Sequence, residues 1–431
     1  MNRWYLRRPV LAWAFYDWAN SAFATTVMAG FFPAFFRQYW SLGSDATTAT
    51  LRLGLANGLA GFIVALLAPI LGILADRSAR RRWFLLSWTL LGIIATGALY
   101  GVSRGQWGMA AGLFVLATMG FNGAIVFYDA LLLQVAEPAE YDRVSAYGYA
   151  LGYLGGGLLF ALNVIMTIHP GWFGLSSTSA AVQFSFLTVA AWWLVFSIPL
   201  ALGVRESAIP ARALSGAGAA GQLGGSAWRE LQGTLREVAS HRPLWMFLLA
   251  YWLYIDGVNT VIKMAIDYGG ALGLPTTGLM AALLLTQFVA FPAALVYGAI
   301  GNRVGARPAI LVGLVVYVVV TLWATTLDSI AAFFGMAVVV GLVQGGVQSL
   351  SRSLFGQFVP AGKSAEYFGF YNMLGKFATV LGPVLIGVTA KLSGSSRAGI
   401  GSVALLFLAG ALLLWCVRVP GQTHPPRPAS H

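Results

Sequence analysis

Long apolar segments separated by short polar stretches run along almost the whole chain. A bilayer core of about 30 Å requires about 20 mainly apolar residues per helix. Twelve segments meet this requirement and predict twelve membrane-spanning helices. They lie near residues 10–37, 53–75, 83–103, 107–133, 144–168, 180–204, 244–268, 277–301, 308–327, 330–355, 366–391 and 398–418. The pattern therefore predicts an all-α membrane protein.

One long polar interruption divides the spans into two sets of six. We expect an N-terminal six-helix bundle at 1–204, a cytoplasmic linker at 205–243, a C-terminal six-helix bundle at 244–420 and a disordered tail at 421–431. Within the linker, a stretch rich in glycine, alanine and serine favours flexibility. Apolar side chains then recur at helical spacing, which predicts a short helix, either on the membrane surface or solvated.

Two short motifs occur once in each set of spans. Asp17-x-x-Asn20 in the first span returns as Asp256-x-x-Asn259 in the seventh. The loop after the second span, Gly72-Ile-Leu-Ala-Asp76-Arg77-Ser-Ala-Arg80-Arg81, has a weaker counterpart after the eighth, at residues 298–307. Such echoes indicate an internal 6 plus 6 duplication, which is common in transporters.

Composition and charge agree with a membrane location. Hydrophobic residues make up 58% of the chain and charged residues 9%, against about 25% charged in soluble domains. The formal charge is +12, and on the predicted topology eighteen basic residues lie on one side against five on the other. This asymmetry is the positive-inside pattern, so we expect both termini in the cytoplasm and no nucleic-acid partner.

Catalytic and metal chemistry is not expected. The chain has one cysteine, Cys416, and its four histidines fall in predicted loops or the tail. The spans lack a nucleophile with a base or a cluster of metal ligands. We therefore expect no cofactor, no metal and no enzyme activity. A receptor or scaffold that moves no solute is the alternative to a transporter.

The loop motif after the second span resembles the signature of the major facilitator superfamily. More narrowly, the chain is similar to the vacuole-effluxer branch, which includes the autophagy-related amino acid permease of fungal vacuoles. The similarity rests on Tyr16-Asp-Trp-Ala-Asn-Ser-Ala-Phe23, Phe127-Tyr-Asp-Ala-Leu-Leu132, Gly345-Gly-Val-Gln-Ser-Leu-Ser-Arg352, Glu366-Tyr-Phe-Gly-Phe-Tyr-Asn372 and Gly375-Lys376. The resemblance implies two six-helix bundles with alternating access, and export of neutral amino acids in the fungal relatives.

The predicted function is secondary active transport. We expect export or exchange of a small polar organic solute, above all amino acids, with proton coupling as an open option. Another small solute or a drug is the alternative substrate. The short loops resemble bacterial members, so we expect a monomer in the lipid bilayer of a bacterial cytoplasmic membrane.

In the facilitator fold, spans one, four, seven and ten line the central cavity. Polar residues spaced three, four or seven apart share a helix face, and each of these spans carries such a stripe; the eleventh adds an amide and a lysine. The candidate substrate- or proton-binding residues are Asp17, Asn20, Asp129, Asp256, Asn259, Gln348, Arg352, Asn372 and Lys376.

An amino acid needs a fixed cation and a fixed anion in its site. Lys376 or Arg352 is expected to meet its carboxylate, and Asp256 or Asp17 its ammonium or a coupling proton. From the rise of 1.5 Å per residue, Asp256 lies roughly 15 to 18 Å deep and Asp17 roughly 7 to 10 Å, nearer the cytoplasmic gate. Alternatively, Asp256 pairs with Lys376, and Asp17 or Asp129 with Arg352, to hold helices in register.

The loop after the second span is the candidate gate. A carboxylate at the amino end of a helix is stabilised by about 0.3 to 1 kcal/mol, and in the family the helix capped in this way is the eleventh, which begins here near Ala365. Alternatively, the arginines only set the topology. Farther along the same span, Gly382-Pro383 predicts a bend. The gating residues are Gly72, Asp76, Arg77, Arg80 and Arg81.

Overall fold

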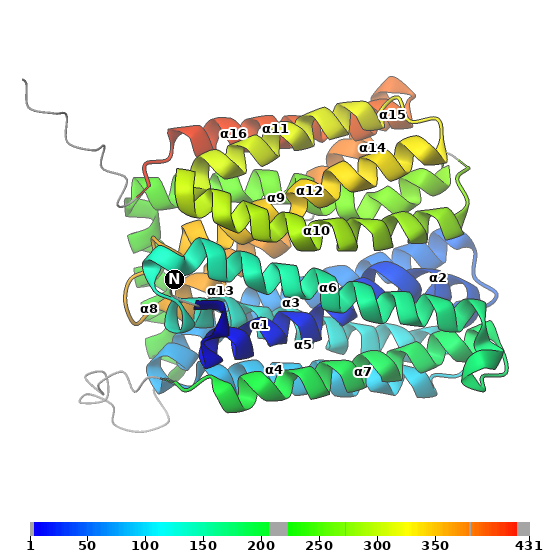
Figure 1. Ribbon diagram of the computed structural model, residues 1–431, viewed down its shortest axis with the longest axis horizontal. Coiled ribbons are helices and arrows are strands. Elements are labelled where there is room, and N and C mark those ends of the chain that lie inside the picture. The colour runs from blue at the N-terminus through cyan, green and yellow to red at the C-terminus, as the bar shows by residue number, and fades with distance from the viewer. Residues whose placement is uncertain (1–3, 207–222, 272, 379–380, 420–431) are drawn as a thin grey trace, which may run out of the picture.

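The computed structural model describes residues 4–206, 223–271, 273–378 and 381–419. These residues form helices and connecting turns without a strand, which confirms the predicted all-α fold. Figure 1 shows two bundles of roughly parallel helices lying side by side, with one helix across their shared end. By length and composition, eleven of the described helical segments can cross a membrane.

The N-terminal half begins with a composite first span, followed by five long helices. The first span consists of α1 (Arg8–Ala22), η2 (Phe23–Phe31), α2 (Phe32–Phe35) and η3 (Phe36–Trp40). The long helices are α3 (Ala46–Ser78), α4 (Arg81–Ala98), α5 (Trp107–Val135), α6 (Tyr141–Ile168) and α7 (Thr178–Gly203). Short 3-10 turns occur at η1 (Trp4–Leu6), η4 (Leu99–Gly101), η5 (Pro138–Glu140) and η6 (Pro170–Phe173).

The C-terminal half repeats this plan with a broken eleventh span. Its helices are α9 (Arg242–Ala271), α10 (Thr276–Val304), α11 (Ala306–Ala324), α12 (Ile330–Gly356), α13 (Ser364–Phe377), α14 (Leu381–Ser393), α15 (Ser396–Ser402) and α16 (Ala404–Cys416). Large exposed apolar residues lie along the outer helices, for example Leu51, Leu55 and Leu59 on α3 and Val312, Val315 and Val319 on α11. These surfaces are suited to contact with lipid.

The first and eleventh spans depart from regular α-helix. In the first span, η2 and η3 have the wider turns of a π-helix, and the N–H of Phe32 bonds to the carbonyl of Val27, five residues back. Pro33 follows directly and has no N–H to continue the α-helical pattern. In the eleventh span, the predicted bend at Gly382-Pro383 is placed too late, because α13 ends at Phe377 and a new helix starts at Leu381. Proline is accommodated there because it lies in the first turn of α14.

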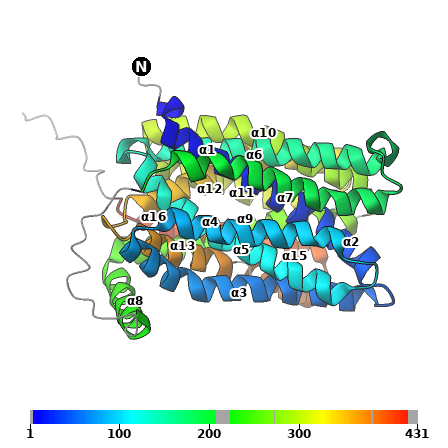
Figure 2. The same cartoon turned by 90° about the horizontal axis from the view of Figure 1, so that it is seen from below.

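The linker helix lies against protein. α8 (Leu223–Ser240) crosses one end of the bundles (Figure 2) and contacts α3 and α13. Its Leu231 is buried with Ile73 of α3 and Phe370 of α13. The predicted helix is confirmed, and one of its faces packs on the protein, a contact that neither proposed setting included. We call this end, which also carries the start of α1, the α8 end. Residues 207–222, within the expected flexible linker, and the expected disordered tail 421–431 lie outside the described residues.

Candidate functional site

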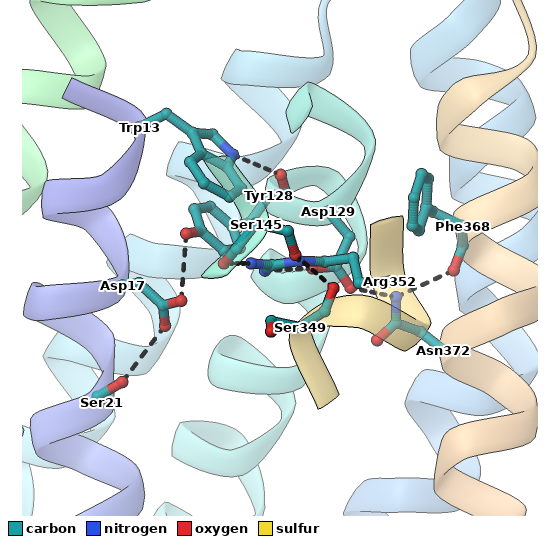
Figure 3. Close-up of polar contacts among 10 residues, drawn as sticks. All are labelled: Trp13, Asp17, Ser21, Tyr128, Asp129, Ser145, Ser349, Arg352, Phe368 and Asn372. Atoms are coloured by element: carbon teal, nitrogen blue, oxygen red, sulfur yellow. Dashed lines mark hydrogen bonds and ion pairs between the residues drawn. The ribbon is translucent and has the colours of Figure 1, made fainter. Parts of the chain in front are cut away.

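Arg352 of α12 lies at the centre of a buried polar network between the two halves (Figure 3). Its side chain is 2% exposed and crosses to the N-terminal half. Nη1 donates to Asp129 Oδ1 of α5 at 3.0 Å. Nε donates to the Ser145 hydroxyl of α6 and Nη2 to the Ser145 carbonyl, both at 2.9 Å. The fixed fork of a guanidinium thus spans two helices of the opposite half.

Three aromatic rings of the N-terminal half surround the same guanidinium. Its carbon lies 4.9 Å from the ring centre of Trp13, 5.2 Å from Tyr128 and 4.5 Å from Tyr149. Rings within about 6 Å of a cation attract it through their negative faces. We call the group formed by Trp13, Tyr128, Asp129, Ser145 and Tyr149 the arginine pocket.

The carboxylate of Asp129 has a second partner from the C-terminal half. Asn372 of α13 donates from Nδ2 to Asp129 Oδ2 at 2.9 Å, and the same amide donates to the Phe368 carbonyl at 3.0 Å. Lys376, one turn farther along α13, adds positive charge near Asp129. Burying an ion pair is favourable only when further hydrogen bonds satisfy both groups. The described contacts meet this condition for Asp129 and Arg352.

Asp17 of α1 joins this network through Tyr128. The Tyr128 hydroxyl donates to Asp17 Oδ2 at 3.2 Å, and Ser21 donates to Oδ1 at 3.3 Å. Helix α6 approaches closely here, since a Cβ on Gly152 would lie 3.0 Å from Asp17 Oδ1. Asn20 is buried near Tyr16 instead. The structure thus brings Asp17, Asp129 and Arg352 into one network, in which Arg352 pairs with Asp129, one of the two partners left open. Asn20 is not part of it.

Asp256 lies in a different environment, although its motif repeats that of Asp17. The carboxylate is fully buried and accepts the backbone N–H groups of Leu381 and Gly382, each at 2.9 Å. Thr260 donates to it at 3.2 Å. Asp256 therefore caps the amino end of α14, where a carboxylate interacts favourably with the helix dipole. Asn259, from the same motif, is half-buried on α9.

A second set of polar contacts joins the halves farther along the bundle. The Tyr153 hydroxyl of α6 donates to Gln348 Oε1 of α12 at 2.9 Å, and Gln344 donates to that hydroxyl at 3.2 Å. Gln287 of α10 donates to the Thr25 hydroxyl in η2 at 2.6 Å. Gln348 thus lies at the interface between the halves.

At the α8 end, Asp76 at the end of α3 contacts the start of α13. Its carboxylate accepts the N–H groups of Ala365 at 3.1 Å and Glu366 at 2.9 Å, and it pairs with Arg81. A Cβ on Gly72 would lie 2.3 Å from the Ala365 carbonyl oxygen. The expected contact with the eleventh span is confirmed, and it holds the two halves together at this end.

Helix α8 adds contacts to both halves. Arg77 of α3 pairs with Glu230, and Thr234 donates to the buried Glu366 of α13. Lys363, just before α13, donates to Glu237 at 2.7 Å. This hydrogen bond lowers the pKa of Glu237. The pKa of Lys363 is raised, because the bond and nearby carboxylates outweigh its partial burial.

Sequence reasoning missed several of these residues. Trp13 and Ser145 were not among the candidates, although Trp13 precedes the candidate Asp17 by one helical turn. Spacing from the known candidate was therefore an available signal. The α8 contacts had no such signal, because they join elements far apart in the sequence. Arg80 is exposed, and its role in gating stays a prediction.

Comparison with known proteins identifies the family. The sequence profile of the family described as "Vacuole effluxer Atg22 like" matches residues 53–140 and 134–423. The chain belongs to this family. It is 35% identical over 414 residues to YxiO of Bacillus subtilis, described as an uncharacterized MFS-type transporter, covering 96% of this chain and 95% of that protein.

More distant relatives are fungal. Autophagy-related protein 22-2 of Neosartorya fischeri is 26% identical over 305 residues, which covers 64% of this chain and 49% of that protein. The protein of the same name from Aspergillus oryzae is 27% identical over 303 residues, with the same coverage. The chain thus spans about half the length of these fungal proteins.

Solved structures share the fold of this family member. The human organic anion transporter MFSD10 superposes with a TM-score of 0.71 at 16% identity, covering 95% of this chain and 99% of that one. The proton:xylose symporter XylE superposes with a TM-score of 0.71 at 12% identity, covering 96% of this chain and 95% of that one. These structures show the shared fold. The family match and the full-length similarity to YxiO make the chain an integral membrane transporter of the major facilitator superfamily and not an enzyme.

Proposed function

We propose that this Atg22-like transporter moves a small polar organic solute, amino acids first among them, by export or exchange. The observation that carries the proposal is the Asp129–Arg352 pair, which joins the two halves at 3.0 Å in a buried position. A solute cannot leave at the α8 end unless the halves separate there. Separation leaves both charges without their partner, and a buried unpaired charge is costly. A zwitterionic solute replaces both partners, because its carboxylate can pair with Arg352 and its ammonium with Asp129.

The proposed site combines this pair with neighbouring polar groups. Arg352 and Lys376 are suited to a carboxylate, and Asp129 and Asp17 to an ammonium or a coupling proton. Asp256 remains a candidate for proton coupling through its contact with α14. In transporters, half-helix amino ends near the membrane centre commonly meet anionic groups. The break in the eleventh span, between α13 and α14, supports a coupling role for the contact of Asp256 with α14.

We infer that the α8 end faces the cytoplasm. The basic loops gather on this side, which is the positive-inside arrangement. The structure then corresponds to a state closed toward the cytoplasm, held by Asp76 and by α8. We further propose that the protein is a monomer in a bacterial cytoplasmic membrane. We also propose that the loop motif after the second span acts as the gate at this end.

The test is transport by purified protein in liposomes. Labelled amino acids should cross the membrane, and Asp129→Asn should lower the rate while the protein remains folded. Asp328→Asn is the matched control, because Asp328 is an exposed aspartate in the turn between α11 and α12. If a broad amino acid panel does not move under any proton gradient, the substrate assignment is wrong. If the wild type transports an amino acid and Asp129→Asn transports it at the same rate, the proposed site is wrong.

A further inference from the structure

We propose that the arginine pocket is a binding site for the cationic group of the transported solute, and that Arg352 occupies it only while the α8 end is closed. The ligand class is a small organic molecule with an ammonium or guanidinium group. This inference rests on the proposed alternating access, since Arg352 must leave before a solute can enter.

The pocket belongs entirely to one half of the protein, whereas its occupant belongs to the other. Trp13 comes from α1, Tyr128 and Asp129 from α5, and Ser145 and Tyr149 from α6. Arg352 comes from α12. When the halves move apart as bodies, the rings, the carboxylate and the Ser145 oxygens stay together while the guanidinium withdraws.

The pocket is held in shape by contacts that do not involve Arg352. The rings of Trp13 and Tyr128 stack with centres 4.4 Å apart, and the Trp13 indole N–H donates to the Tyr128 carbonyl at 2.8 Å. The Tyr128 hydroxyl is fixed by Asp17. Gly148 permits this packing, since a Cβ there would lie 2.6 Å from that hydroxyl. A preorganised site of this kind loses little entropy on binding.

Its chemistry selects an organic cation. Asn372, the second hydrogen-bond donor to Asp129, lies on α13, which belongs to the departing half. When Arg352 withdraws, the buried carboxylate of Asp129 therefore loses Asn372 as well. Asp17 adds a second carboxylate nearby. A proton would neutralise one charge but would leave the aromatic faces without a partner. An ammonium or guanidinium satisfies the carboxylate, the two Ser145 acceptors and the rings together.

The test uses full-length Arg352→Ala protein in detergent, with methylguanidinium as the probe. Methylurea is the matched control, because it has nearly the same shape without the charge, and sodium chloride controls for ionic strength. The melting midpoint of Arg352→Ala should rise with methylguanidinium concentration, as for any ligand of the folded state. The wild-type midpoint should not rise, because Arg352 fills the pocket. Arg352→Ala/Asp129→Asn should lose the response.

Arg352→Gln serves as a second variant, since its amide can still donate to Ser145. If neither variant is folded when purified alone, recovery of folded protein in methylguanidinium but not in methylurea supports the pocket. Equal behaviour in methylguanidinium and methylurea, in midpoint or in recovery, overturns it. These measurements do not require transport. Binding of methylguanidinium without amino acid transport in liposomes would therefore support the pocket and reject the proposed function. Amino acid transport without such binding would support the proposed function and reject the pocket.

Discussion

Arg352 of α12 and Asp129 of α5 form a buried ion pair across the two halves, with 3.0 Å between Nη1 and Oδ1. Each charge also has hydrogen bonds to neutral groups of the opposite half, to Ser145 and to Asn372. The pair is therefore a strong contact in the closed state, and separating its two buried charges on opening is costly. Most of the proposed mechanism depends on this relationship.

Neutralising one member of the pair should destabilise the protein more than neutralising both. Asp129→Asn leaves a buried guanidinium without its counter-ion, which costs about 3 to 5 kcal/mol in comparable cases. Arg352→Gln/Asp129→Asn removes both charges and should recover part of this loss. Thermal or denaturant unfolding in detergent measures the coupling by a double-mutant cycle. Additive effects of the two substitutions would show that the pair is not coupled.

Gly72→Ala should prevent close contact of α3 with α13. The added Cβ would meet the backbone carbonyl of Ala365 at 2.3 Å, so the helices must separate. We expect easier opening of the α8 end, measured as faster labelling of a cysteine introduced at Glu366. Gly54→Ala lies on the same helix with open space around the new Cβ and should label at the parent rate. Equal labelling of both variants would contradict the predicted gate.

Leu231→Ala should loosen α8 without disturbing either bundle. Leu231 is 8% exposed between Ile73 and Phe370, and core Leu→Ala substitutions cost about 2 to 5 kcal/mol; the position of α8 at the edge favours the lower end. Limited proteolysis of the linker should accelerate. Leu235→Ala, on the same helix but 46% exposed, is the control. Unchanged proteolysis of Leu231→Ala would show that this contact does not hold α8.

The Glu237–Lys363 contact should depend on pH in a defined direction. The pKa of Glu237 is lowered in the folded protein, so its contribution is present above its unfolded pKa and is lost as the pH falls through the folded value. The pKa of Lys363 is raised, so its contribution is lost only as the pH rises through that higher value. Both side chains are partly exposed, and exposed pairs contribute about 0 to 1 kcal/mol.

Lys363→Ala measures this contribution. The difference in melting midpoint between wild type and variant should be small near neutral pH and should shrink on acidification below the usual range of a glutamate. Lys391→Ala, at an exposed lysine near the end of α14, controls for general loss of charge. A difference that grows on acidification would contradict the assigned pair.

Asp256→Asn should fold but transport slowly. Asparagine keeps an oxygen that accepts an N–H group of α14 and is nearly as good a helix cap as aspartate, whereas Asp256→Ala should lose about 0.5 to 2 kcal/mol. If Asp256 also carries a coupling proton, as we propose, uptake into liposomes falls in Asp256→Asn despite its near-normal melting midpoint. Unimpaired uptake would leave Asp256 as a structural cap.

The sequence predicted the architecture well because hydrophobic length determines which segments cross a bilayer. It also predicted the contact of Asp76 with the eleventh span, because this motif resembles that of a known family. It did not predict the contact of Asp256 with the backbone at the start of α14, since the break before Leu381 depends on a contact between α9 and the eleventh span. The docking of α8 was missed for a related reason. Helical periodicity identifies an apolar face but not the surface that covers it.

The arginine pocket shows the same limit. Arg352 and Asp129 were both candidates from their polar stripes, and their pairing was one of two options left open. The choice between Asp17 and Asp129 as the partner depends on how α5 is rotated relative to α12. This rotation is set by packing across the whole interface between the halves. A single helix pattern contains no information about it.

The central claim is that the closed α8 end opens during transport. Spin labels at Ser78→Cys and Ala361→Cys, in a Cys416→Ser background, report this directly, because both sites are exposed and flank the Asp76 contact. In liposomes, the distance between the labels should show one population without solute. A second, longer distance should appear when a transported amino acid is added. A single unchanged distance while that amino acid crosses the membrane would contradict the account.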